Sequence, residues 1–188
     1  MEKEVYNITG VTAKKELQIG LLFGISFVIL WGILFVGFQY IQNITDFKII
    51  TSFSFLCTMS IALSVSYFIL KILGAKQREK FIFQLEKDHM EIHYHENTIF
   101  FDYTNIEEIS LVGTANTMRY FKIKTKNRSL KIRLGTYHLA PFSEHNDILT
   151  IDIVMKSLVE KLTLLNFFNK KVVIPNKTFE HRIFRNNP

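Results

Sequence analysis

Two long apolar runs, separated by a short polar gap, dominate the hydropathy pattern of this chain. No charged residue occurs from Leu17 to Thr45, and none occurs from Ile49 to Leu70. At a helical rise of ~1.5 Å per residue, the two runs would be roughly 43 and 33 Å long, against ~30 Å for the hydrocarbon core of a bilayer. Lipid offers no partner for the open edge of a strand. The pattern therefore predicts a two-helix transmembrane hairpin over residues 17–71.

The arrangement of the apolar residues, and not their number, indicates a membrane protein. A hydrophobic content of 48% is ordinary for a soluble chain. The first run is longer than the ~7 to 15 residues of a signal-peptide core, and it lacks a convincing cleavage site, so we expect it to be retained. The single cysteine, Cys57, lies within the second run and excludes an intramolecular disulfide.

Basic residues are concentrated at the outer ends of the two runs. Lys14 and Lys15 precede the first run, whereas the connecting loop contains only Lys48. Four more follow the second run: Lys71, Lys76, Arg78 and Lys80. Because Lys and Arg close to a span are retained on the cytoplasmic side, we expect a multi-pass protein with both termini in the cytoplasm.

Small residues recur at intervals of four in both apolar runs. The first run contains Gly20 and Gly24, and the second contains Ser54, Thr58, Ala62 and Ser66. Helices in lipid associate by close approach of their backbones, which small side chains permit. We expect the two stripes to pack against each other within the hairpin. A homo-oligomer that uses the same stripes is the alternative.

After Lys80 the apolar pattern changes to a period of two. Six short segments of strand type are separated by polar turns: Phe81–Leu85, His89–Tyr94, Thr98–Tyr103, Ile106–Val112, Met118–Thr125 and Ser129–Leu134. A weaker seventh segment covers Gly135–Leu139. The short spacing predicts antiparallel hairpins.

A helical pattern follows, from about Glu144 to Asn166. Its apolar residues form one broad stripe made of Ile148, Ile151, Val154, Met155, Leu158, Val159, Leu162 and Leu165. We expect this amphipathic helix to cover the sheet. The chain then divides into a cytoplasmic N-terminal lead (1–16), the hairpin (17–71), an α+β domain (79–168) and a basic C-terminal tail (169–188). The tail either adds an edge strand or orders only on a partner.

The segment Ile99–Ile109, with the sequence IFFDYTNIEEI, joins an aromatic strand directly to the next strand. Together with the order of elements, it resembles the pleckstrin-homology-like (PH-like) domain of small bacterial membrane proteins, in which two spans precede the domain. The resemblance implies an antiparallel sandwich or barrel of six or seven strands, closed by the C-terminal helix. It also implies binding or scaffolding far more often than catalysis, although a fold alone does not fix function. We expect the protein to lie in the cytoplasmic (inner) membrane.

The strongest charge feature is the predicted hairpin from Arg119 to Arg133, which has seven basic residues and no acidic one. We name these residues the basic strip: Arg119, Lys122, Lys124, Lys126, Arg128, Lys131 and Arg133. Basic and apolar residues alternate, so one face of the hairpin is basic. The strip either attracts anionic lipid headgroups, at ~1 kcal/mol per basic residue, or an acidic partner. Alternatively, it is a solvated face whose lysines protect a strand edge. Nothing requires a nucleic acid.

No catalytic or metal-binding motif occurs. His89, His93 and His95 have no cysteine nearby, and zinc sites usually assemble three or four ligands. Glu107 and Glu108 are adjacent, so on a strand they point to opposite faces. A phosphate loop and a nucleophile elbow are both missing. We expect neither a cofactor nor a metal, and no enzyme activity.

The function that remains is a non-enzymatic integral membrane protein whose cytoplasmic domain binds a protein partner. Such a protein would be an accessory or regulatory subunit, or an immunity protein that neutralises a membrane-acting toxin. The alternative is a sensor or scaffold that binds anionic membrane lipids through the basic strip.

Overall fold

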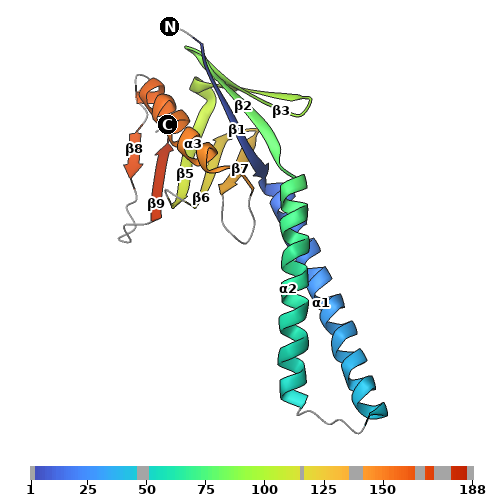
Figure 1. Cartoon of the computed structure of the whole chain (residues 1–188). Coiled ribbons are helices and arrows are strands. Elements are labelled where there is room, and N and C mark those ends of the chain that lie inside the picture. The colour runs from blue at the N-terminus through green and yellow to red at the C-terminus, as the bar shows by residue number, and fades with distance from the viewer. Residues whose placement is uncertain are drawn as a thin grey trace.

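A computed structural model describes residues 3–45, 51–114, 117–135, 142–163, 168–171 and 179–185 of the chain. It has an antiparallel sheet, one helix packed on that sheet, and a long helical hairpin that projects from the domain (Figure 1). The prediction of a helical hairpin joined to an α+β domain is confirmed.

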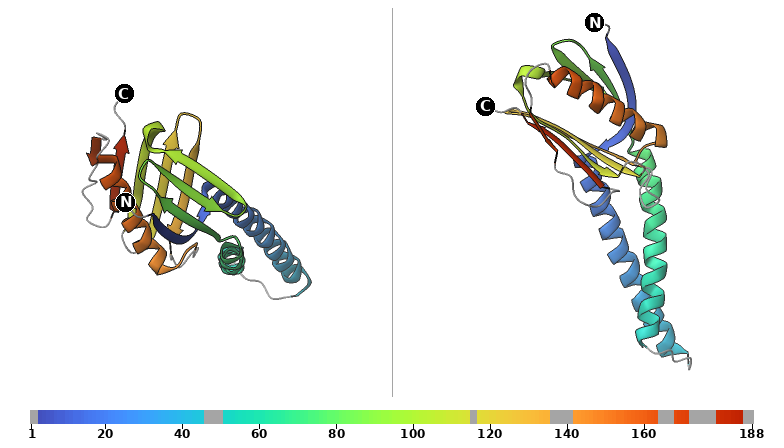
Figure 2. Two further views of the ribbon diagram at one scale, coloured as in Figure 1. Left: turned by 90° about the horizontal axis from the view of Figure 1, so that it is seen from above. Right: turned by 90° about the vertical axis from the view of Figure 1, so that its left-hand side faces the viewer.

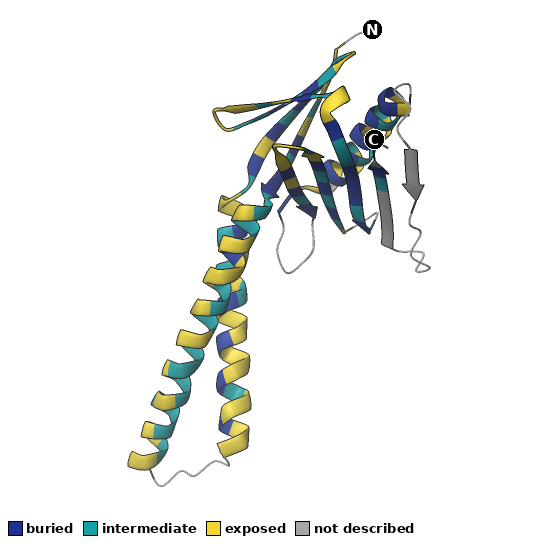
Figure 3. Ribbon diagram, turned by 180° about the vertical axis from the view of Figure 1, so that it is seen from behind, coloured by how far each residue is buried: buried dark blue, intermediate teal, exposed yellow. Residues whose placement is uncertain are grey.

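The hairpin consists of α1 (Ala13–Ile44) and α2 (Thr51–Lys76). Both helices are long and apolar enough to cross a membrane, with mean hydropathies of 2.6 and 1.9 in their most apolar windows. Only 6% and 22% of these windows are buried inside the protein. Figure 3 shows the exposed residues along the length of both helices. A core helix of a soluble protein would instead bury its apolar side chains.

The nine described strands form one antiparallel sheet in the order β4-β3-β2-β1-β7-β6-β5-β9-β8. The strands are β1 (Glu4–Thr12), β2 (Glu79–Leu85), β3 (His89–Tyr94), β4 (Asn97–Asp102), β5 (Ile106–Thr114), β6 (Met118–Thr125), β7 (Ser129–Gly135), β8 (Phe168–Lys171) and β9 (Phe179–Arg185). A 3₁₀ turn, η1 (Tyr103–Asn105), joins β4 to β5.

The sheet differs from the predicted barrel in closure and in strand number. Over the described residues it is open, and β4 and β8 are its edges. The six segments predicted between Phe81 and Leu134 correspond to β2–β7, and the additional strands are β1, β8 and β9. The C-terminal segment therefore contributes strands, which was one of its two expected fates. The weak seventh segment, beyond Gly135, lies outside the described residues.

The N-terminal lead is part of the sheet. Strand β1 pairs with β2 from Glu4↔Leu85 to Gly10↔Glu79, and it pairs with β7 through Val11↔Arg133 and Thr12↔Ile132. The hairpin is thus inserted between two adjacent strands, because α1 begins directly after β1 and α2 ends just before β2. The start of α1 and the end of α2 therefore lie side by side at the sheet, at a point that we call the hairpin root (Figure 1).

Helix α3 (His145–Thr163) covers one face of the sheet, as predicted. Its buried apolar residues are Ile148, Ile151, Val154, Met155, Leu158 and Leu162, and they belong to the stripe seen in the sequence. They pack with residues of β1–β7, among them Phe83 and Phe121, whose rings meet edge to face at 5.6 Å. The right-hand view of Figure 2 shows α3 on one side of this sheet and the hairpin extending to the other side.

Candidate functional site

Arg119 does not belong to the exposed basic strip. Its side chain is only 1% exposed and lies on the core side of β6, where its guanidinium donates to Gly113 O at 2.8 Å. A second nitrogen lies 3.1 Å from Asp152 Oδ2 of α3. Successive side chains of a strand point to opposite faces of the sheet. Arg119 therefore points to the same face as Phe121 and Ile123, which is the core face, and Lys122 points to the other face. The expectation that Arg119 contacts a ligand is corrected accordingly.

Three other residues of the strip have acidic partners. Lys122 Nζ lies 2.8 Å from Glu108 Oε1, and Lys124 Nζ lies 2.9 Å from Glu107 Oε2. Arg133 forms an ion pair with Glu16 in the first turn of α1. These contacts neutralise much of the charge in the middle of the strip, which sequence inspection of the segment 119–133 does not reveal.

Tyr120 and Arg133 attach the sheet to the hairpin root. Burial raises the pKa of Tyr120, so its hydroxyl stays protonated and donates to Glu16 Oε1 at 3.2 Å. The Arg133 guanidinium also stacks on the Phe142 ring, at 4.9 Å from its centroid, and Lys131 Nζ lies 4.9 Å from the Tyr120 centroid. Both contacts are of the cation–π type. Arg133 and Tyr120 are therefore positioning residues of the root.

Like Lys131, whose ammonium lies over the Tyr120 ring, Lys126 and Arg128 are exposed strip residues with no ion-pair partner among the described side chains. They lie in the β6–β7 turn. This turn is fixed by a hydrogen bond from Thr125 N to Arg128 O at 2.8 Å and by one from Arg128 N to Thr125 Oγ1 at 3.2 Å. Two of the three exposed strip residues without an ion pair therefore lie at one tip.

This tip borders a groove of about 1020 Å³. We call it the distal groove, and it is lined by Phe100, Phe101, Asp102, Thr104, Asn105, Ile106, Glu107, Glu108, Lys124, Thr125, Lys126, Asn127 and Arg128. One wall is the end of β4 with η1, and the other is the β6–β7 turn. In the right-hand view of Figure 2, the β4–β5 bend lies at the end of the domain opposite the hairpin root.

The β4 wall is preorganised. Asp102 Oδ1 accepts hydrogen bonds from Thr104 Oγ1 at 2.7 Å and from Thr104 N at 2.9 Å, and these bonds lower the pKa of Asp102. Asp102 therefore caps η1 as a carboxylate. Phe100, 52% exposed, stacks on the His89 ring at 4.4 Å between centroids. Because β4 is an edge of the sheet, its outer backbone groups have no neighbouring strand in the described part of the chain.

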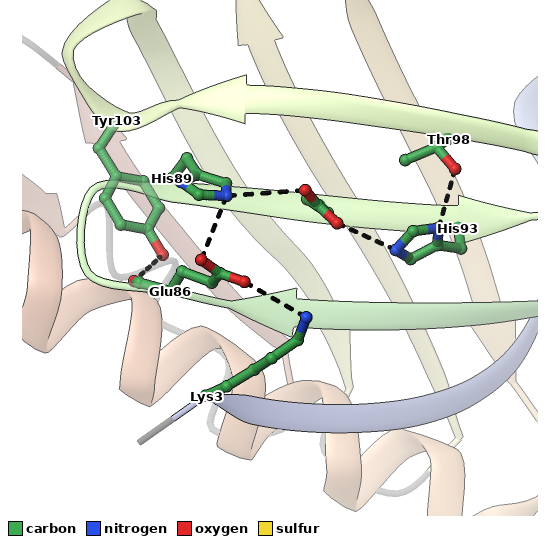
Figure 4. A network of polar contacts seen from close by, with 7 residues as sticks. Lys3, Glu86, His89, His93, Thr98 and Tyr103 are labelled. Carbon is green, nitrogen blue, oxygen red and sulfur yellow. Dashed lines mark hydrogen bonds and ion pairs between the residues drawn. The ribbon is translucent and has the colours of Figure 1, made fainter. Parts of the chain in front are cut away.

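A polar network crosses the outer face of β1–β4 (Figure 4). His89 Nε2 lies 3.5 Å from Glu86 and 3.6 Å from Glu91, while His93 Nε2 lies 3.2 Å from Glu91. His95 lies apart, because it adopts a φ of 51° in the β3–β4 turn and contacts Glu79. Among the residues that the structure describes, no group of three or more His, Cys, Asp or Glu has an arrangement that could hold a metal ion.

The small residues of α2 face α1, whereas the glycines of α1 do not form the predicted contact. Ser54, Thr58, Ala62 and Ser66 are buried. A Cβ added at Gly20 or Gly24 would meet nothing within 4 Å. Large side chains meet α2 instead: Trp31 and Phe35 of α1 contact Phe55, with centroids 5.1 and 5.9 Å apart.

The fold is an α+β domain with an open antiparallel sheet and a long apolar hairpin inserted between adjacent strands. No protein-family model matches the chain, and no curated protein or solved structure matches it either.

Proposed function

We propose that this chain is a non-enzymatic, membrane-anchored binding module whose cytoplasmic domain takes an extended segment of a protein partner in the distal groove. The PH-like resemblance belongs to this proposal, since it implies binding. So do the inner-membrane location and the role as an accessory subunit or an immunity protein.

The anchoring is supported by the exposure of both apolar helices and by the position of β1. A removable signal sequence would be cleaved after its apolar run, and cleavage there would also remove β1, which pairs with both β2 and β7. Because β1 pairs with β2, both ends of the hairpin lie next to the domain and therefore on the same side of the membrane as the domain. Lys14, Lys15 and Lys71 at these ends support a cytoplasmic domain.

The groove is supported by three features that meet at one place. β4 is an open edge to which an extended segment can add as a further strand, as in β-augmentation. Phe100 supplies an exposed aromatic surface, and Lys126 and Arg128 supply side-chain cations that form no ion pair with a described residue. The decisive observation is that two of the three exposed strip residues without an ion pair, Lys126 and Arg128, line the groove. Charge complementarity then selects a segment with acidic side chains.

A second candidate, binding of anionic lipid, is favoured by one observation. The uncovered face of β5–β7 is turned toward the side of the hairpin (Figure 2), and it carries Lys122, Lys124 and Lys131. The pairing of Lys122 and Lys124 with glutamates weakens this candidate.

Photo-crosslinking in intact cells tests the groove. A photoreactive phenylalanine analogue at Phe100 in the full-length chain should give a discrete protein adduct. The adduct should disappear on the double charge reversal Lys126→Glu/Arg128→Glu, because the acidic segment is then repelled. The matched control is Lys87→Glu/Lys156→Glu, which reverses two exposed lysines outside the groove.

The analogue is also placed at Leu149, an exposed residue of α3. An adduct that forms equally from Leu149, or that survives the groove reversal, would contradict the proposal. Adducts to phospholipid in place of protein would favour the second candidate.

A further inference from the structure

A second groove lies at the hairpin root, between the first turns of α1 and the last turn of α2. Its volume is about 350 Å³. We call it the root groove, and it is lined by Lys15, Gln18, Ile19, Leu21, Leu22, Leu73 and Gln77.

The lining changes from polar to apolar along the direction of α1. The uncharged stretch of α1 begins at Leu17, and that of α2 ends at Leu70. The root groove therefore straddles the level at which the hairpin would pass from headgroups into hydrocarbon. From Lys15 to Leu22 the helix rises by about 10 Å, so one ligand can contact both zones. Leu21 and Leu22 are 58% and 51% exposed, so the groove is accessible from the surrounding lipid.

Packing beneath the groove keeps its walls in place. Ile19 is buried in a cluster with Val11 and Phe142, which ties α1 to the domain. Lys15 Nζ lies 2.7 Å from Glu79 Oε1, and the Glu79 side chain is only 2% exposed. The ammonium group is thus held at the polar end of the groove by a buried carboxylate.

We propose that the root groove binds one acyl chain of a membrane phospholipid, with the lipid phosphate at Lys15, Gln18 and Gln77. A volume of about 350 Å³ is near the lower end of the ~300–1,000 Å³ range of ligand pockets, so it suits one chain and not a whole lipid. The Lys15 ammonium has three N–H donors, of which one faces Glu79 Oε1, and its nitrogen also lies 3.2 Å from His95 Nε2. Each glutamine amide adds two more donors. These donors match the acceptor oxygens of a phosphate, and the leucines match a hydrocarbon chain.

The inference rests on the membrane crossing proposed above and is independent of the distal groove. The test therefore begins with carbonate washing of membranes that contain the full-length chain. A chain released by the wash would overturn the crossing, and the root site with it.

The retained chain is purified in mild detergent, and its bound phospholipid is measured by native mass spectrometry and phosphate analysis. We expect a single phospholipid to remain on each chain. Leu22→Trp fills the groove and should abolish retention. Val36→Trp is the matched control, because Val36 is 67% exposed on α1 outside the groove, and it should retain the lipid.

Gln77→Glu provides a second variant at an exposed position, where folding should not be affected. It places a negative charge beside the phosphate, so the fraction of chains that carry lipid should fall severalfold. A wild-type chain without lipid would overturn the proposal. Equal retention by Leu22→Trp and Val36→Trp would overturn it as well.

Discussion

Arg119 shows how strongly the phase of a strand decides what one charged residue does. Three residues before Lys122 in the sequence, it resembles one more surface cation, yet its side chain is the largest of the fully buried ones among the described residues. Burial of a guanidinium is tolerated because Gly113 O and Asp152 accept its hydrogen bonds. Lys124, five residues further on, has an exposed ion pair in which both partners stay accessible to water.

The stability of the two variants should differ accordingly. Arg119→Ala leaves a cavity and removes the partner of Asp152, so the free energy of unfolding should fall by about 3 to 5 kcal/mol, as for a broken buried pair. Lys124→Ala should cost about 0 to 1 kcal/mol, because exposed ion pairs contribute little. Denaturant unfolding of the full-length chain in detergent, followed by Tyr103 and Tyr120 absorbance, measures both. Equal losses would show that Arg119 is not structurally required.

At the scale of elements, the hairpin is asymmetric in how its helices pack. α2 presents its small side chains to α1, while α1 contributes Ile19, Trp31 and Phe35. The aromatic residues of α1 contact Phe55, and the buried small side chains of α2 allow the two backbones to approach each other. Spacing alone identified the α2 stripe, whereas the glycines of α1 occur at the same spacing without taking part.

This asymmetry predicts opposite outcomes for two similar substitutions. Ala62 is fully buried, so Ala62→Leu should separate the helices and lower the thermal midpoint of the chain in detergent. Gly24→Leu should leave the midpoint unchanged, because a side chain there meets open space. If the wild-type chain can be cross-linked as a dimer, and Gly24→Leu abolishes that cross-link while the thermal midpoint stays unchanged, the glycines form a contact of a homo-oligomer. A lowered midpoint for Gly24→Leu alone would contradict the helix arrangement.

At the scale of the whole molecule, the insertion of the hairpin between β1 and β2 makes the domain and the hairpin one unit. The sheet is attached to the hairpin through two strand ends, and Glu16 adds its contacts to Tyr120 and Arg133. The β4–β5 bend, whose residues line the distal groove, consequently lies at a fixed end of the domain, away from the root (Figure 2).

The proposed topology predicts which positions are reachable from outside the cell. In a Cys57→Ser background, a cysteine at Asn43, near the end of α1, should react with an impermeant maleimide. A cysteine at Asn127, in the β6–β7 turn, should react only after the membrane is permeabilised. Both positions are exposed, so access and not burial decides the result. If the cysteine at position 127 were labelled in intact cells, the domain would lie outside the cell and the proposed orientation would be wrong.

The sequence by itself determined the elements whose evidence is local. Uncharged length predicted α1 and α2, alternation predicted β3 and β6 to the residue, and the apolar stripe from Ile148 to Leu162 predicted α3 and its buried face. In each case the periodicity of a short stretch of sequence shows which of its side chains are buried, so the element can be predicted without knowing its distant partner.

Tertiary structure decided everything that depends on a partner far along the chain. Strand β1 can be identified only in the folded chain, because its partners β2 and β7 lie far away in the sequence. Glu16 neutralises Arg133 across 117 positions, and Asp152 receives Arg119 across 33. The distal groove likewise joins η1 to the β6–β7 turn. Such pairings follow from which surfaces the folded chain brings together, and local periodicity carries no information about them.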